Sequence, residues 1–125
     1  MKRDQRLRTG ADFRRAREQA PRGWPHSLVV LYVVPNELGR TRVGITVSSR
    51  VGNAVVRNRV RRRLREAVRG RLDRLAPGID ALLIARPASA RAAWRELAEA
   101  VDSVLQRAGA TIPMATWVEA QITRA

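Results

Sequence analysis

The chain has 125 residues, of which 25 are lysine or arginine and 11 are acidic, and its net charge is +14. A chain of this length forms one domain that can bury a core, and the lack of cysteine excludes disulfides, thiolate zinc sites and a cysteine nucleophile. No apolar run approaches the ~18 residues of a membrane span and no apolar region follows the basic N-terminus, so we expect no secretory signal, no membrane partner and a cytoplasmic location.

The N-terminal part is expected to form a basic arm and then a short helix. The arm covers residues 1–8 and the helix residues 9–20, with Phe13 as the side chain that fixes the helix to the core. Proline and glycine end this helix, and one more short strand is an option near residues 22–26.

Two strands are expected next. Residues 27–34 are rich in β-branched side chains and end at a proline, as is typical of a strand. Alternation places Val30 and Tyr32 on one face of that strand and Leu31 on the other. Residues 42–48 predict a second strand, expected as the hairpin partner of the first.

A long basic helix follows, between residues 51 and 75. Its apolar residues recur at steps of three and four, which places them on one helix face; they are Val56, Val60, Leu64, Ala67, Val68 and Leu75. The residues expected on the opposite, outer face are Asn58, Arg59, Arg62, Arg65 and Arg69. Asn53 is expected to cap the start, and Ala76-Pro77-Gly78 to stop the helix.

The charge of this helix favours a polyanionic partner over a merely solvated surface. Residues 57–65 read RNRVRRRLR, six arginines in nine residues. A solvated helix normally alternates positive and negative charges, whereas like charges repel unless a polyanion neutralises them and releases its counterions. Nucleic acid is the expected partner, ahead of an anionic membrane surface.

The C-terminal part predicts a buried strand and a last helix. Residues 79–85 form a nearly continuous apolar run, which indicates burial on both sides. The helix is expected from residue 89 or 90 to residue 108, and its inner stripe is Trp94, Leu97, Ala98, Val101, Val104 and Leu105. The class is therefore α+β, a small sheet with helices packed on it.

The sequence shows no catalytic site. His26 is the only histidine, and we expect it to be a surface or turn residue. Glu96, Glu99 and Asp102 share one side of the last helix and could bind Mg²⁺, but a solvated face is the better interpretation beside so many arginines. Asp80, at a strand start, is expected to be structural.

The residues alone favour RNA over DNA without excluding DNA. A basic helix can enter the major groove of DNA, but the usual dimer zipper or three-helix scaffold is not visible. A sheet face with Tyr32 near Phe13 suits stacking of an unpaired strand. Core packing of the two rings is the competing interpretation.

The stretch RVGITVSSRVGNAVVRNRVRRRLREAVR, Arg42 to Arg69, resembles the signature of the bacterial ribonuclease P protein subunit. The defining pattern is G-N-A-V-x-R-N-R-x-[KR]-R-x-x-R, and the flanks agree through D-F at Asp12-Phe13, V-L-Y at Val30 to Tyr32 and A-R-P at Ala85 to Pro87.

The resemblance implies a fold and a function. The fold is an α/β sandwich, a four-stranded sheet with three helices and a left-handed β-α-β crossover, similar to a ribosomal protein domain. It would occupy residues 1–110 as a single RNA-binding domain, with residues 111–125 as an extension of unknown role. The activity is endonucleolytic removal of the 5′ leader of precursor tRNA. A catalytic RNA performs the cleavage with Mg²⁺ held by RNA and substrate, and the protein assists. The alternative is a structural RNA-binding protein without a role in cleavage.

The resemblance also implies two sets of binding residues. The set facing the catalytic RNA is Asn53, Arg57, Asn58, Arg59, Arg61, Arg62, Arg65 and Arg69. The set lining a cleft for the single-stranded leader is Phe13, Arg17, Val30, Tyr32, Thr46, Ser48 and Arg50. Two positions depart from the family: Arg17 stands where a second aromatic residue is usual, and Ser49 where a lysine is common.

Overall fold

The computed structural model describes residues 2–110, and the predicted extension at residues 111–125 lies outside them. Helix α1 (Gly10–Gln19) follows a 3₁₀ turn, η1 (Arg3–Gln5), and strands β1 (Gly23–Pro25), β2 (Val29–Pro35) and β3 (Arg42–Thr46) come next. They are followed by α2 (Ala54–Arg69), the turn η2 (Leu72–Arg74), β4 (Ile79–Ala85), the turn η3 (Pro87–Arg91) and α3 (Trp94–Arg107). The α+β class is confirmed, and so is the short strand near residues 22–26.

The sheet has the strand order β1-β2-β4-β3. Strand β2 is antiparallel to β1 and β4, and β3 is parallel to β4. The prediction of a β2–β3 hairpin is therefore wrong. Strand β4 lies between β2 and β3, and its apolar run is covered on both faces by side chains of the two cores, with Ala81, Leu82 and Leu83 all buried.

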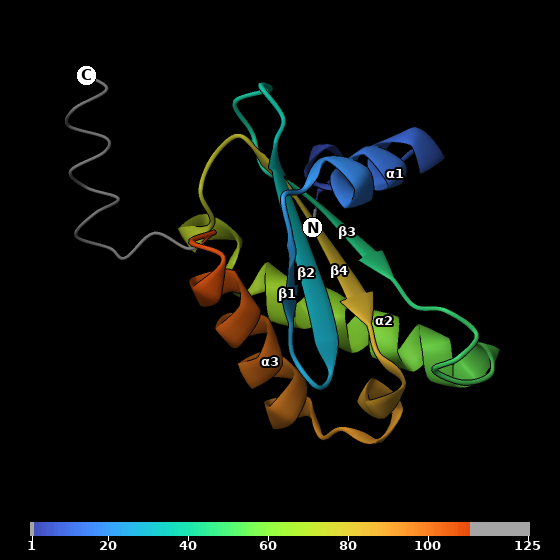
Figure 1. Ribbon diagram of the computed structural model, residues 1–125. Coiled ribbons are helices and arrows are strands. Elements are labelled where there is room, and N and C mark those ends of the chain that lie inside the picture. Colours follow the sequence, from blue (N-terminus) through green and yellow to red (C-terminus); the bar gives the residue numbers. More distant parts are fainter. Residues whose placement is uncertain (1, 111–125) are drawn as a thin grey trace.

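The β3–α2–β4 connection is left-handed. Strands β3 and β4 run in the same direction, and α2 crosses behind them in Figure 1, with β3 on the right of β4. Nearly all such crossovers are right-handed, so this topology is a specific feature of the fold.

Helices cover the two faces of the sheet unequally. Helices α2 and α3 lie on one face, and α1 lies on the other (Figure 1). The larger core lies under α2 and α3 and includes Leu31, Leu64, Leu83 and Leu97. The smaller core, under α1, has Leu7, Ala16, Val34 and Leu82 as its buried members. Much of the second face is therefore left without a helix.

Two helix boundaries differ from the prediction. Helix α2 ends at Arg69 rather than near residue 75, because Gly70 caps it and donates its backbone N–H to Glu66 and Val68. Helix α3 begins at Trp94, since the preceding residues form η3 instead. Trp94 is consequently 44% exposed and does not belong to the inner stripe.

Candidate RNA interface

Helix α2 is anchored by its cap and its apolar seam. The Oδ1 atom of Asn53 accepts a hydrogen bond from the backbone N–H of Val56 at 3.0 Å. The buried residues of the helix are Val60, Leu64, Ala67 and Val68. The predicted seam is confirmed at these four positions, whereas Leu75 lies beyond the end of the helix. The side-chain oxygen of Asn53 is committed to the helix cap.

The arginines of α2 differ in exposure. Arg62 is exposed, as is Asn58, whose Oδ1 accepts from Nη1 of Arg61 at 2.9 Å. Arg59 lies on a flank of the helix rather than fully outward, because its Nη2 donates to the carbonyl of Ala90 at 3.0 Å. The Nε atoms of three half-buried arginines lack an acceptor within residues 2–110, namely those of Arg57, Arg59 and Arg65.

The protein's own carboxylates leave this surface largely unneutralised. Arg69 pairs with Glu66 one turn earlier, and the hydrogen bond from Arg69 lowers the pKa of Glu66. Within residues 2–110, the other predicted arginines of the helix form no ion pair with a carboxylate. Their positive charge therefore remains available to an external anion.

Most of the predicted leader residues lie on the sheet face that α1 covers only in part. Val30, Tyr32 and Thr46 are half-buried there, and both Tyr32 and Phe13 of α1 pack against the smaller core. Ser48 and Arg50 are exposed in the connection from β3 to α2. Burial of the two rings is incomplete, so both retain surface that a base could contact.

Arg17 stacks on Tyr32. Its guanidinium carbon lies 5.0 Å from the centre of the tyrosine ring, a cation–π distance. The position where the family often has an aromatic residue thus still contributes a planar group to this face, with a positive charge added.

Phe13 and Arg65 line the same hollow at the β3 edge of the sheet. This hollow has a volume of about 90 Å³, and its other lining residues are Arg6, Leu7, Val43, Gly44 and Ile45. The basic helix surface and the half-open sheet face therefore meet there.

Gly44 makes this packing feasible, and a larger residue is expected to disrupt it. A Cβ atom on Gly44 would lie 2.7 Å from the Phe13 ring and 2.8 Å from a Leu7 methyl group. Gly44→Ala should lower the free energy of unfolding by about 1–3 kcal/mol through overpacking, measured by urea denaturation. Gly70→Ala is the control, because its Cβ would meet nothing closer than 3.8 Å. Equal stabilities of the two variants would contradict the proposed packing role.

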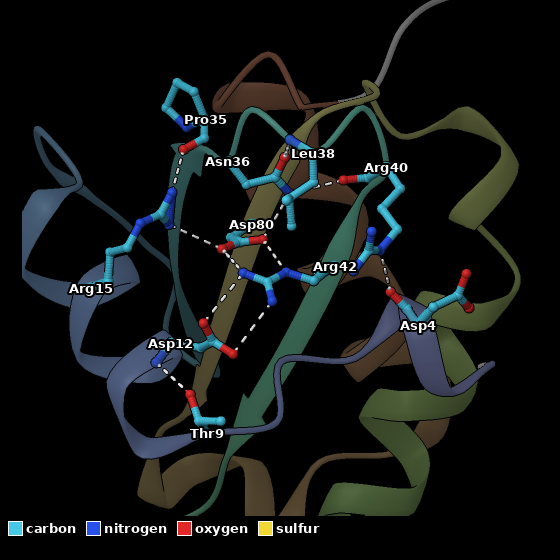
Figure 2. Close-up of polar contacts among 10 residues, drawn as sticks. All are labelled: Asp4, Thr9, Asp12, Arg15, Pro35, Asn36, Leu38, Arg40, Arg42 and Asp80. Atoms are coloured by element: carbon cyan, nitrogen blue, oxygen red, sulfur yellow. Dashed lines mark hydrogen bonds and ion pairs between the residues drawn. The ribbon is translucent and has the colours of Figure 1, made fainter.

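A buried ion cluster, which sequence reasoning did not find, fixes α1 to the sheet (Figure 2). The side chain of Asp80 is fully buried and accepts from Arg42 at 2.8 and 2.9 Å and from Arg15 at 3.1 Å. Asn36 donates to the same carboxylate at 2.9 Å. Arg42 also reaches Asp12 of α1 at 3.4 Å, so the helix that carries Phe13 and Arg17 is tied to β3 and β4.

The cluster shifts two pKa values in the directions that keep its members charged. The hydrogen bonds to Asp80 raise the pKa of Arg42 despite its burial. Burial alone would raise the pKa of Asp12, but hydrogen bonds from Thr9 and the charge of Arg42 outweigh it and lower that pKa.

The acidic residues of α3 do not form a metal site. Asp102 pairs with Arg71, whose Nη2 lies 2.9 Å from Oδ2, and Glu96 accepts the backbone N–H of Ala93 at 2.9 Å. Within residues 2–110, no group of three or more histidine or acidic side chains is placed to hold a metal ion.

The Asp102–Arg71 pair is expected to make stability depend on pH. The hydrogen bond from Arg71 lowers the pKa of Asp102 in the folded state, against the opposing effect of burial. The pair therefore stabilises the fold fully above the unfolded-state pKa of about 3.9, and this contribution is lost as the pH falls through the lower folded-state value. The stability difference between wild type and Asp102→Asn should shrink below about pH 4 in urea titrations. A difference that stays constant with pH would contradict this.

No helix within residues 2–110 is long and apolar enough to cross a bilayer.

Fold and surface together define a basic α+β protein in which an arginine-rich helix meets a half-open sheet face. The family model described as ribonuclease P matches residues 1–109, and the chain belongs to this family of ribonuclease P protein components.

Named relatives and solved structures agree with this assignment. The chain is 46% identical to a "Ribonuclease P protein component" of Herpetosiphon aurantiacus, over 86% of this chain and 87% of the relative. A relative of the same description from Roseiflexus castenholzii is also 46% identical, over 87% and 89% of the two chains. The fold is similar to that of the RNase P protein of Staphylococcus aureus, with a TM-score of 0.79 and 28% identity, over 86% of this chain and 98% of that one. It is also similar to that of the RNase P protein of Thermotoga maritima, with a TM-score of 0.73 and 25% identity, over 82% of this chain and 96% of that one.

Proposed function

We propose that this chain assists a catalytic RNA in the endonucleolytic removal of the 5′ leader from precursor tRNA. The observation that carries the proposal is the hollow lined by both Arg65 and Phe13. At this hollow, a surface suited to folded RNA meets a surface suited to an unpaired strand. This is expected of a protein that holds the catalytic RNA and the leader near the same scissile bond.

The α2 surface is the proposed contact with the catalytic RNA. Arg62 and Asn58 are exposed on it, and Arg57, Arg61 and Arg65 lie beside them on the same helix. Guanidinium groups bind phosphate in a two-pronged geometry, and their neutralisation of phosphates releases counterions. An RNA oxygen would also supply an acceptor for the buried Nε atoms of Arg57 and Arg65.

The sheet face is the proposed contact with the leader. Tyr32 and Phe13 would stack on bases, and Thr46 and Ser48 would donate hydrogen bonds to them. Arg17 would add a cation beside the stacked ring. Because mature tRNA has no leader, these contacts favour substrate over product through differential binding.

Mg²⁺ belongs, in this proposal, to the RNA subunit and the substrate. Bound there, the ion would activate the attacking water and stabilise the leaving oxygen. The role of the protein is electrostatic: its arginines lower the repulsion between crowded phosphates, so that substrate and RNA approach each other at lower Mg²⁺ concentrations.

The proposal is tested by the affinities of the reconstituted RNA–protein complex for precursor and mature tRNA. We expect the protein to increase the preference for the precursor relative to the catalytic RNA alone. An unchanged preference would favour a purely structural RNA-binding protein.

Tyr32→Ala should weaken precursor binding about tenfold, because stacking on one base contributes about 1–3 kcal/mol. Mature tRNA should bind as before. Tyr32→Phe keeps the ring and serves as the matched control, and both variants are compared in the same equilibrium binding assay. Equal losses for precursor and mature tRNA in Tyr32→Ala would exclude the sheet face as the leader site.

A further inference from the structure

A second groove lies at the end of the sheet where β3 and β4 terminate. It has a volume of about 500 Å³ and is lined by Arg50, Val51, Pro87, Ala88, Ala90 and Arg91. One wall is the connection from β3 to α2, and the other is η3. Neither Arg91 nor the η3 wall has a role in the function proposed above.

The groove continues the path of the half-open sheet face. Thr46 of β3 pairs with Ile84 of β4 in the last register position of that ladder. Beyond this pair the two strands lead to the two walls of the groove, through residues 47–50 on one side and residues 85–87 on the other. Figure 1 shows both connections at the same end of the sheet. An RNA strand leaving the sheet face at Thr46 and Ser48 would therefore reach this groove next.

The chemistry of the groove suits a phosphodiester chain. Arg50 and Arg91 are exposed, and within residues 2–110 their guanidinium groups form no ion pair. No acidic residue lines the groove, and its remaining lining is aliphatic. Two positive groups beside an apolar surface match a phosphate flanked by sugars and bases.

The η3 wall is held firmly by its own contacts. Ser89 is 1% exposed, and its hydroxyl donates to the carbonyl of Arg86 at 2.6 Å. From α2, Arg59 donates to the carbonyl of Ala90 and Arg63 to that of Ala92, at 3.0 and 3.1 Å. The wall is therefore preorganised, which lowers the entropic cost of binding a ligand.

We propose that this groove binds the backbone of leader nucleotides that have passed the sheet face, with Arg91 as a phosphate ligand opposite Arg50. The inference rests on the proposed leader-binding function and extends it to η3. It predicts that long leaders gain contacts that short leaders cannot make.

Arg91→Gln tests this in the reconstituted complex, with precursor tRNAs whose leaders increase in length. For long leaders, loss of one contact to a single-strand phosphate should reduce the slope of log affinity against log salt by about 0.7. For leaders too short to pass Ser48 the slope should not change. Arg74→Gln is the matched control, because it removes the same charge from an exposed position in η2. An Arg91→Gln slope equal to that of wild type at every leader length would overturn the inference.

A second measurement identifies which RNA occupies the groove. The chain has no cysteine, so Ala88→Cys creates one attachment point for an iron chelate that generates hydroxyl radicals. We expect strand breaks in the distal leader, and none there when the chelate is attached through Asp73→Cys in η2. Breaks confined to the catalytic RNA would overturn the assignment to the leader.

Failure of this inference is distinguishable from failure of the proposed function. If wild type prefers precursor to mature tRNA but Arg91→Gln behaves like wild type, only the groove assignment is wrong. If wild type shows no such preference even with the shortest leaders, the proposed leader site itself fails.

Discussion

Replacing Asp80 with alanine is expected to lower the free energy of unfolding by about 3–5 kcal/mol. The fully buried carboxylate accepts hydrogen bonds from Arg42, Arg15 and Asn36, and without it Arg42, whose side chain is 15% exposed, keeps a largely buried charge with only the longer contact to Asp12. Urea denaturation followed by circular dichroism measures the loss.

Two further variants make this prediction specific. Asp80→Asn retains the shape but not the charge and should fall between wild type and Asp80→Ala. Asp73→Ala removes an exposed acid in η2 and should stay within about 0.5 kcal/mol of wild type. A loss below about 1 kcal/mol for Asp80→Ala would show that the cluster does not hold α1 to the sheet.

Combined replacement of Arg57 and Arg62 by alanine should have the largest effect on RNA binding. Each arginine that contacts a phosphate contributes about one unit to the slope of log affinity against log salt, so the double variant should lose about two units. The measurement is a titration of the catalytic RNA at several salt concentrations. The fold should persist, because neither side chain forms an ion pair within residues 2–110.

The control for this pair is Arg95→Ala, which removes one exposed charge from α3. Its slope should stay close to that of wild type. The single variants Arg57→Ala and Arg62→Ala are measured beside it. If all three single variants reduced the slope equally, binding would depend on net charge and not on the α2 surface.

Local patterns were predictable from the sequence. The apolar seam of α2 repeats with the helical period, and Asn53 caps the helix as expected. The apolar run of β4 correctly indicated burial on both faces. In each case, the decisive interactions occur within a few residues or follow from hydrophobicity alone.

Long-range pairings were not predictable in the same way. The parallel pairing of β3 with β4 requires a crossover through α2, and a β2–β3 hairpin satisfies the same local pattern. The partners of Asp80 lie 38, 44 and 65 residues away in the sequence, and each looks like an ordinary surface residue until the fold brings them together. The exposure of Trp94 likewise depends on where η3 ends, which periodicity does not reveal.

Within the candidate site, the sequence identified residue types better than their geometry. Arg59 was expected to point outward, but its contact with Ala90 turns it toward η3. The stacking of Arg17 on Tyr32 depends on how α1 lies across β2, which is set by the buried cluster and not by the motif.

The central claim is that RNA breaks the bond and the protein makes this feasible at low Mg²⁺. The most direct measurement is the cleavage rate of a precursor tRNA at low Mg²⁺ with the protein alone, the catalytic RNA alone, and both together. We predict no cleavage by the protein alone, slow cleavage by the RNA alone and much faster cleavage by the two combined. Cleavage by the isolated protein, or a rate that the protein leaves unchanged, would contradict the account.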